Sequence, residues 1–134
     1  MARYVIDAPT LLHVVDNEMS VDPSHQLVAP NSVRSDALQM LLHEVRCGER
    51  SHKDALERHE RMTELRIRLL GDRVSRRTAW RIAVEQDWNT LRDAEYVAIA
   101  RLQADALVTV DSELAAKAAT VVRVVAVQDL LTPG

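Results

Sequence analysis

The sequence has 134 residues, a length that fits one domain spanning 1–134. Hydrophobic residues make up 47% and charged residues 28%, which is typical of a globular chain and excludes a disordered one. The formal net charge of −3 is unlike that of a strongly basic protein that coats nucleic acid, although metal-binding carboxylates would also lower the charge of a nuclease. Cys47 is the single cysteine, so no disulfide forms within the chain and a reducing, cytoplasmic setting is expected.

Short apolar stretches predict the strands. The first, 3–6, is β-branched and aromatic, and is expected to begin the fold rather than to form a signal peptide. The others are 27–29, 106–110 and 121–125, with 67–70 as a weaker candidate. No apolar run approaches the roughly 20 residues that cross a bilayer.

Helices are predicted between most of these strands, where apolar residues recur at helical spacing. The predicted ranges are 32–47, 53–66, 75–86, 91–103 and 112–119, and 16–26 is the most loop-like segment. Strands that alternate with helices indicate right-handed crossovers and a sheet covered on both faces. The expected fold is therefore a three-layer α/β/α arrangement with four or five mainly parallel strands.

Four aspartates are expected to meet at the carboxyl edge of this sheet. Asp7 directly follows the first strand, and Asp111 directly follows the strand 106–110. Asp36 lies early in the helix after the second strand. Asp93 lies in the first turn of the helix 91–103, which runs antiparallel to the strand that it precedes, so its start lies near Asp111. Parallel sheets bind ligands at this edge, where the strand order reverses.

Carboxylates at this density need a cation. Two like charges about 4 Å apart repel by about 4 kcal/mol at an effective dielectric constant near 20. Hard oxygen ligands favour Mg²⁺ or Mn²⁺, which activates water and stabilises charge on a phosphodiester. The sequence therefore predicts a metal-dependent nuclease with Asp7, Asp36, Asp93 and Asp111 as catalytic metal ligands.

Two runs carry a resemblance to a known family. The run 93–102, Asp-Ala-Glu-Tyr-Val-Ala-Ile-Ala-Arg-Leu, and the run 106–111, Ala-Leu-Val-Thr-Val-Asp, resemble the signature of PIN-domain ribonucleases. They most resemble the toxin half of bacterial VapB–VapC toxin–antitoxin pairs. Val5-Ile6-Asp7 and Val28-Ala29-Pro30, followed by Asp36, extend the resemblance over essentially the whole chain. It implies a PIN-like fold, an endoribonuclease that cleaves RNA, a homodimer, and a VapB-like antitoxin that blocks the acidic groove.

Two positions depart from the family pattern. The second acid is usually Glu where this chain has Asp36, and Pro9 stands where the family often has Ser or Thr, with Thr10 one residue further on. These departures favour a second hypothesis, a catalytically weak or inactive PIN-like module that binds RNA or a protein. A third, a phosphoacceptor receiver domain, needs paired acids after the first strand and a late lysine, whereas Lys117 lies in a predicted helix.

Several residues allow more than one interpretation. Asp93 and Asp111 also fit helix capping, Glu44 competes with Asp36 as the second acid, and Glu113 is a candidate further ligand. Thr109 is either a core residue or a hydroxyl that supports the site. Arginines in the segment 66–81 suit phosphate contact or a solvated helix face. Apolar residues open to either an interface or a core role are Val14, Val15, Met40 and Leu41.

Overall fold

The computed structural model describes residues 2–132 and contains a five-stranded sheet in the order β3-β2-β1-β4-β5. The strands are β1 (Arg3–Ile6), β2 (Gln26–Pro30), β3 (Ile67–Leu70), β4 (Ala106–Val108) and β5 (Val124–Val125). All four neighbouring pairs are parallel. The order reverses between β1 and β4, which are direct neighbours with Val5 opposite Leu107.

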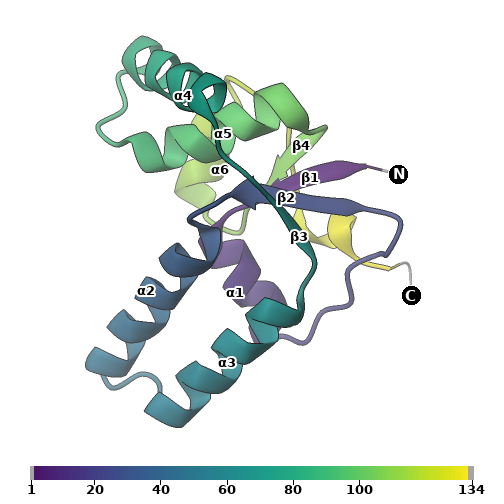
Figure 1. The fold of residues 1–134 in the computed structure, drawn as a ribbon, viewed down its shortest axis with the longest axis vertical. Helices are drawn as coiled ribbons and strands as arrows, with labels where there is room; N and C mark the ends of the chain where they lie inside the picture. The colour runs from purple at the N-terminus through teal and green to yellow at the C-terminus, as the bar shows by residue number, and fades with distance from the viewer. Residues whose placement is uncertain (1, 133–134) are drawn as a thin grey trace.

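Helices cover both faces of the sheet. One set consists of α1 (Ala8–Asp16), α2 (Val33–Arg46) and α3 (His52–Glu64), and the other of α4 (Arg73–Gln86), α5 (Leu91–Gln103) and α6 (Ser112–Ala118). Right-handed crossovers separate the sets because β1, β2 and β3 step along the sheet in one direction, while β3, β4 and β5 step in the other. Figure 1 shows α2 and α3 as a pair below the sheet and α4 and α5 above it. The predicted three-layer α/β/α fold is confirmed, with five strands, all of them parallel.

The core lies between the sheet and the helices on either side. The central strands β1, β2 and β4 are buried over most of their residues, and α5 buries six of its thirteen residues, five of them in the run 96–100. Val14, Val15 and Leu41 belong to this core, and Met40 packs against it while partly exposed, which favours the core interpretation of these residues. Within residues 2–132, no helix combines the length and the apolar character needed to cross a membrane.

Two predicted strands are too long. The strand predicted at 106–110 ends at Val108, because Thr109 and Val110 leave the ladder to bond with the side chains of Asp7, which caps α1, and of Thr10 in α1. The strand predicted at 121–125 contains only Val124–Val125, since the backbone N–H groups of Val121 and Val122 donate to the Ala118 carbonyl at the end of α6. In both places hydrogen bonds to neighbouring elements replace strand pairing.

Two helical elements escaped prediction, α1 and the 3₁₀ helix Val127–Leu130. Helix α1 is nine residues long and buries six of them. Pro9 lies in its first turn, where a proline needs no hydrogen-bond donor. The departure at Pro9 is therefore compatible with a regular helix start.

The turn between α2 and α3 is held by Arg50. Its guanidinium donates to Asp16 at 2.9 Å, to Glu44 at 2.7 Å and to Asp54 at 2.5 Å, and its side chain is 15% exposed. These carboxylates raise the pKa of Arg50, with the hydrogen bond to Asp16 as the main cause. Glu44 therefore belongs to a structural ion-pair cluster near the end of α2, whereas Asp36 lies in the first turn of that helix.

We expect Arg50→Met to lower the free energy of unfolding by about 1–3 kcal/mol, because a partly buried cation is lost, Glu44 loses its ion pair, and Asp16 and Asp54 keep only Arg58 as a partner. Chemical denaturation measures the change. Arg61→Met is the matched control, since Arg61 forms one exposed ion pair with Glu18 and its removal should have a smaller effect. Equal effects of the two variants would contradict the structural role of Arg50.

Candidate metal centre

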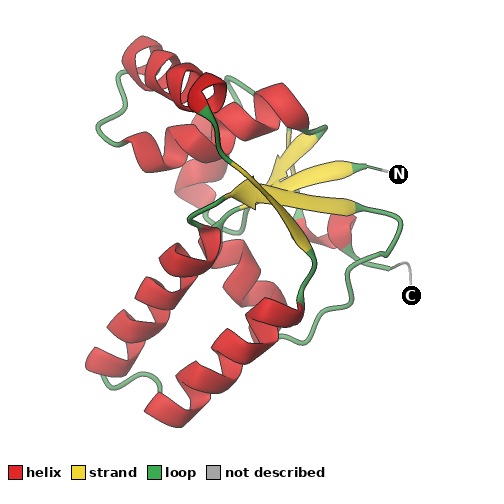
Figure 2. Ribbon diagram, in the orientation of Figure 1, coloured by secondary structure: helices red, strands yellow, loops and turns green. Residues whose placement is uncertain are grey.

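Asp7 and Asp111 lie at the same edge of the sheet, as the sequence predicts. Asp7 follows β1 and caps the start of α1, and Asp111 follows the β4 segment and caps α6. Because β1 and β4 are neighbours at the reversal of strand order, these two positions face the crevice where parallel sheets bind ligands. Figure 2 shows that α1 and α2 begin on the side toward which β1 and β2 run.

Two threonine hydroxyls join Asp7 to the segment after β4. Thr109 Oγ1 donates to Asp7 Oδ2 at 2.7 Å and accepts from the Asp111 backbone N–H at 3.0 Å. Thr10 Oγ1 donates to Asp7 Oδ1 and accepts from the Val110 backbone N–H at 3.0 Å. Each hydroxyl uses its one proton on the carboxylate and its lone pair on a backbone N–H. Thr109 is therefore a supporting hydroxyl, and Thr10 is the hydroxyl near the first acid.

Burial governs the charge of Asp7, which is 2% exposed. Removal from water raises the pKa of this carboxyl, and the hydrogen bonds from Thr10 and Thr109 only partly oppose that effect. A positive charge beside Asp7 would therefore stabilise its carboxylate form.

Tyr96 links Asp36 to the region of Asp7. The Tyr96 hydroxyl donates to Asp36 Oδ2 at 3.0 Å. Burial raises the pKa of Tyr96 most, and the charge of Asp36, its hydrogen bond and the charge of Asp7 raise it further. One buried hydroxyl therefore experiences the negative charge of both aspartates. The shorter side chain of Asp36 is held in place from α5, where Tyr96 lies one turn after Asp93.

Asp93 and Asp111 have partners of their own. Asp93 Oδ2 lies 2.6 Å from Lys117 Nζ, and Asp111 Oδ1 accepts from the backbone N–H groups of Glu113 and Leu114. The capping interpretation thus holds for Asp111, and the cap uses only Oδ1 of its carboxylate. Glu113 is exposed and contributes its backbone N–H to Asp111.

The donor set fits a hard divalent ion. In the described part of the chain, no three His, Cys, Asp or Glu side chains are grouped closely enough to enclose a metal by themselves. Mg²⁺ does not require such a cage, since it usually keeps several waters and binds one or two carboxylates. Asp7 and Asp36, whose charges both raise the pKa of the Tyr96 hydroxyl, are the oxygen donors that such an ion would use.

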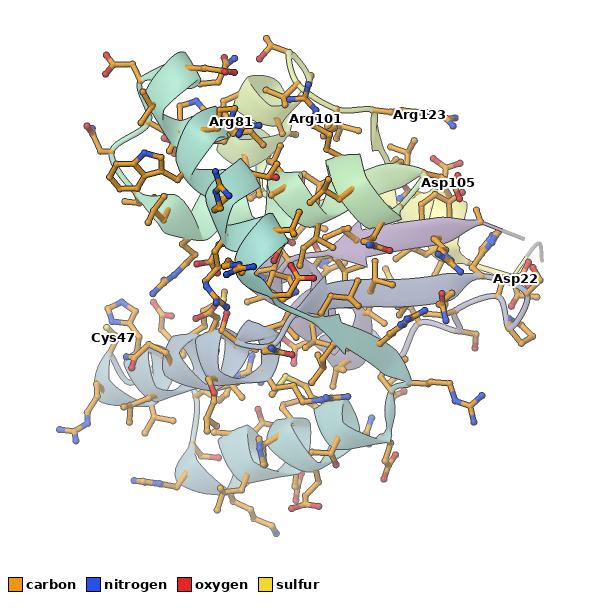
Figure 3. The ribbon with its side chains drawn as sticks, turned by 45° about the horizontal axis from the view of Figure 1, so that its top comes forward. Asp22, Cys47, Arg81, Arg101, Asp105 and Arg123 are labelled. Carbon is orange, nitrogen blue, oxygen red and sulfur yellow. The ribbon has the colours of Figure 1, made fainter. Side chains whose placement is uncertain are left out.

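Acids elsewhere in the chain serve the fold. Asp105 accepts from the Arg3 backbone N–H at 2.7 Å, which ties the amino ends of β1 and β4 together, as expected for a turn acid. Figure 3 shows Asp105 and Asp22 at one end of the molecule and Cys47 at the other. Cys47 is exposed at the end of α2.

The sequence did not predict three contacts of this region: the hydrogen bond from Thr10 to Asp7, the hydrogen bond from Tyr96 to Asp36, and the ion pair of Lys117 with Asp93. The signal for Tyr96 is its position three residues after Asp93, which puts both on one side of a helix. The contact of Lys117 crosses from α6 to α5 and has no sequence signal.

The fold is shared with solved structures. No family model and no curated protein matches the sequence. The crystal structure of PAE2754 from Pyrobaculum aerophilum superposes with a TM-score of 0.70 at 25% identity, covering 96% of this chain and 93% of that one. The structure of VapBC-1 from nontypeable Haemophilus influenzae superposes with a TM-score of 0.64 at 14% identity, covering 94% of this chain and 98% of that one.

These similarities define the class of the fold. The parallel sheet, its order and its three layers make this a PIN-like α/β protein. Within that class, the chain has a VapC-like PIN fold. The resemblance in the runs 93–102 and 106–111 and the observed fold therefore agree.

We expect Thr109→Val to lower the free energy of unfolding by about 1–3 kcal/mol, because a buried hydroxyl that satisfies Asp7 and the Asp111 N–H is replaced by a methyl group. Thermal or chemical unfolding in a chelator measures the change without a contribution from metal. The control is Thr63→Val, whose hydroxyl is exposed and bonds to its own helix, and it should be close to neutral. A neutral Thr109→Val would refute the bridging role.

Proposed function

We propose that the protein is a metal-dependent endoribonuclease that cleaves RNA phosphodiesters, and that it acts in the cytoplasm as the toxin of a toxin–antitoxin pair. The observation that carries this proposal is the buried Asp7, bridged by Thr109 to the Asp111 backbone at the reversal of strand order. The VapC-like fold supports the same reaction class.

The ligands proposed for Mg²⁺ or Mn²⁺ are Asp7, Asp36, Asp93 and Asp111. When bound, such an ion supplies activation of water and neutralisation of charge on the phosphodiester. Thr10 and Thr109 orient the Asp7 carboxylate, and Tyr96 orients that of Asp36. Fixed partners of this kind reduce the movement needed to reach the reactive arrangement.

The start of α4 supports an approach by RNA. It follows β3, so its first residues lie at the carboxyl edge of the sheet. Arg73, Arg76 and Arg77 are exposed there, and Arg76 shares a small cavity with Ser32, whose hydroxyl lies 3.4 Å from Asp36. Guanidinium groups bind phosphate oxygens and suit positioning of an RNA backbone without reading its sequence.

By analogy with VapBC-1, the proposed protein partner is a VapB-like antitoxin. A groove of 410 Å³ between α2 and α3 suits the apolar face of a partner helix, because its lining is mostly aliphatic and includes the exposed Leu38, Leu42 and Leu56. The homodimer implied by the resemblance stays a prediction. The exposed apolar side chains of Trp80 and Val84 on α4 are a candidate surface for this homodimer.

The alternative, a PIN-like module that binds RNA or a protein without cleaving, is favoured by Asp36, whose side chain is one methylene shorter than the Glu usual in the family that the sequence resembles. It predicts RNA binding that survives chelation and no cleavage at any metal concentration. Cleavage assays therefore decide between the two functions.

We expect the purified protein to cleave a panel of RNAs with Mg²⁺ or Mn²⁺, and a chelator to abolish cleavage. Asp7→Asn and Asp93→Asn should each reduce the rate about 100-fold or more, because they weaken ligands of an ion whose effect amounts to several kcal/mol. The control is Asp105→Asn, an acid at the opposite edge that binds the Arg3 N–H. Cleavage that survives both site variants would rule out the proposed centre.

We further expect the product of an adjacent antitoxin-like reading frame to form a stoichiometric complex with this chain and to inhibit its RNA cleavage. Leu42→Ser and Leu56→Ser, at exposed positions of the α2–α3 groove, should weaken that complex without reducing cleavage by the free protein. The control is Trp80→Ser, outside the groove. Calorimetric titration measures the affinities, and an unchanged affinity of both groove variants would exclude this surface.

A further inference from the structure

Lys117 lies at a point where the proposed metal centre needs a vacant carboxylate. We propose that Lys117 is an internal counter-ion that competes with the metal for Asp93 and so lowers the metal affinity of the centre. This inference rests on the proposed function and deepens it, since it assigns a regulating residue to the same site.

The ion pair between Lys117 and Asp93 joins two helices. Lys117 lies in the last turn of α6 and Asp93 in the first turn of α5, and their charged atoms are 2.6 Å apart. The two side chains are 30% and 32% exposed, so the pair is partly shielded from water. An ammonium group at this distance neutralises Oδ2, so a divalent cation that bound this oxygen would have to compete with it.

Trp88 provides a second contact for the same ammonium group. Lys117 Nζ lies 4.9 Å from the centre of the Trp88 ring, within the range of a cation–π interaction. The lysine side chain is a flexible stem with a compact charge, so it can leave Asp93 and remain against the ring. The Trp88 ring therefore provides an alternative contact for the Lys117 ammonium group when a metal binds Asp93.

Other cations near the centre are more loosely held. Arg92 Nε lies 3.9 Å from Asp36 Oδ1, and the Arg92 side chain is 69% exposed. An exposed pair at that distance contributes little and is screened by salt. The close contact of Lys117 makes it the cation that a metal must displace from Asp93.

The sequence also supplies a matched control. It contains two lysines, Lys117 and Lys53, and Lys53 is exposed on α3. Removing either lysine changes the net charge equally, whereas only Lys117 contacts a proposed ligand. Any difference between the two variants therefore reports local competition rather than net charge.

The experiment is a calorimetric titration of Mn²⁺ into metal-free protein. We expect Lys117→Met to bind Mn²⁺ about three- to tenfold more tightly than the wild type, as expected when one nearby positive charge is removed from a partly exposed site. Lys117→Arg and Lys53→Met should bind like the wild type. Lys117→Gln replaces Lys117→Met if the latter does not fold.

A double variant tests whether Lys117 acts through Asp93. In the Asp93→Asn background, Lys117→Met should leave the Mn²⁺ affinity unchanged, because the contested carboxylate is gone. In a Trp80→Phe background, Trp88 is the single tryptophan, and Mg²⁺ should change its emission when the ammonium group leaves Asp93. That change should be absent in Lys117→Met.

The outcomes separate the two proposals. If the wild type binds Mn²⁺ and Lys117→Met binds it with the same affinity, the inference is wrong and the metal centre stands. An effect of Lys117→Met that persists fully in the Asp93→Asn background also overturns it. If neither protein binds Mn²⁺, the metal centre itself is wrong, and this inference falls with it.

Discussion

The hydrogen bonds that two threonine hydroxyls donate to the buried Asp7 carboxylate are the interaction on which this edge of the molecule depends. A carboxylate removed from water is costly unless hydrogen-bonded, and Thr10 and Thr109 supply those bonds from α1 and from the segment after β4. The same hydroxyls accept the N–H groups of Val110 and Asp111. This arrangement ends β4, starts α6 and keeps Asp7 beside Asp111.

The acidic residues at this edge carry charge of the same sign, and each has partners of its own that stabilise its carboxylate. Asp36 accepts the buried Tyr96 hydroxyl, Asp93 pairs with Lys117, and Asp111 accepts backbone N–H groups of α6. Asp7, the most deeply buried of them, has hydroxyls but no positive partner. The remaining demand for positive charge is therefore greatest at Asp7, next to the reversal of strand order.

The two ends of the molecule have different chemistry. The sheet edge with Asp7 is rich in charged oxygens, while the α2–α3 pair ends in an apolar groove near Leu42 and Leu56. Arg50 holds that pair together through three carboxylates at the turn. Helix α2 contributes to both ends, since it carries Asp36 in its first turn and lines the groove, and function is therefore argued from sites rather than from the fold alone.

The sequence by itself determined the alternation of strands and helices, the parallel sheet and the position of Asp7 and Asp111 at strand ends, because these follow from periodicity and connection rules. It did not reveal α1, a nine-residue helix with Pro9 in its first turn, or the early end of β4 at Val108. The tertiary structure alone decided that Thr10 reaches Asp7 and that Lys117 reaches Asp93. The contact of Lys117 crosses between helices α5 and α6, and no local pattern encodes which side chains meet when separate helices pack.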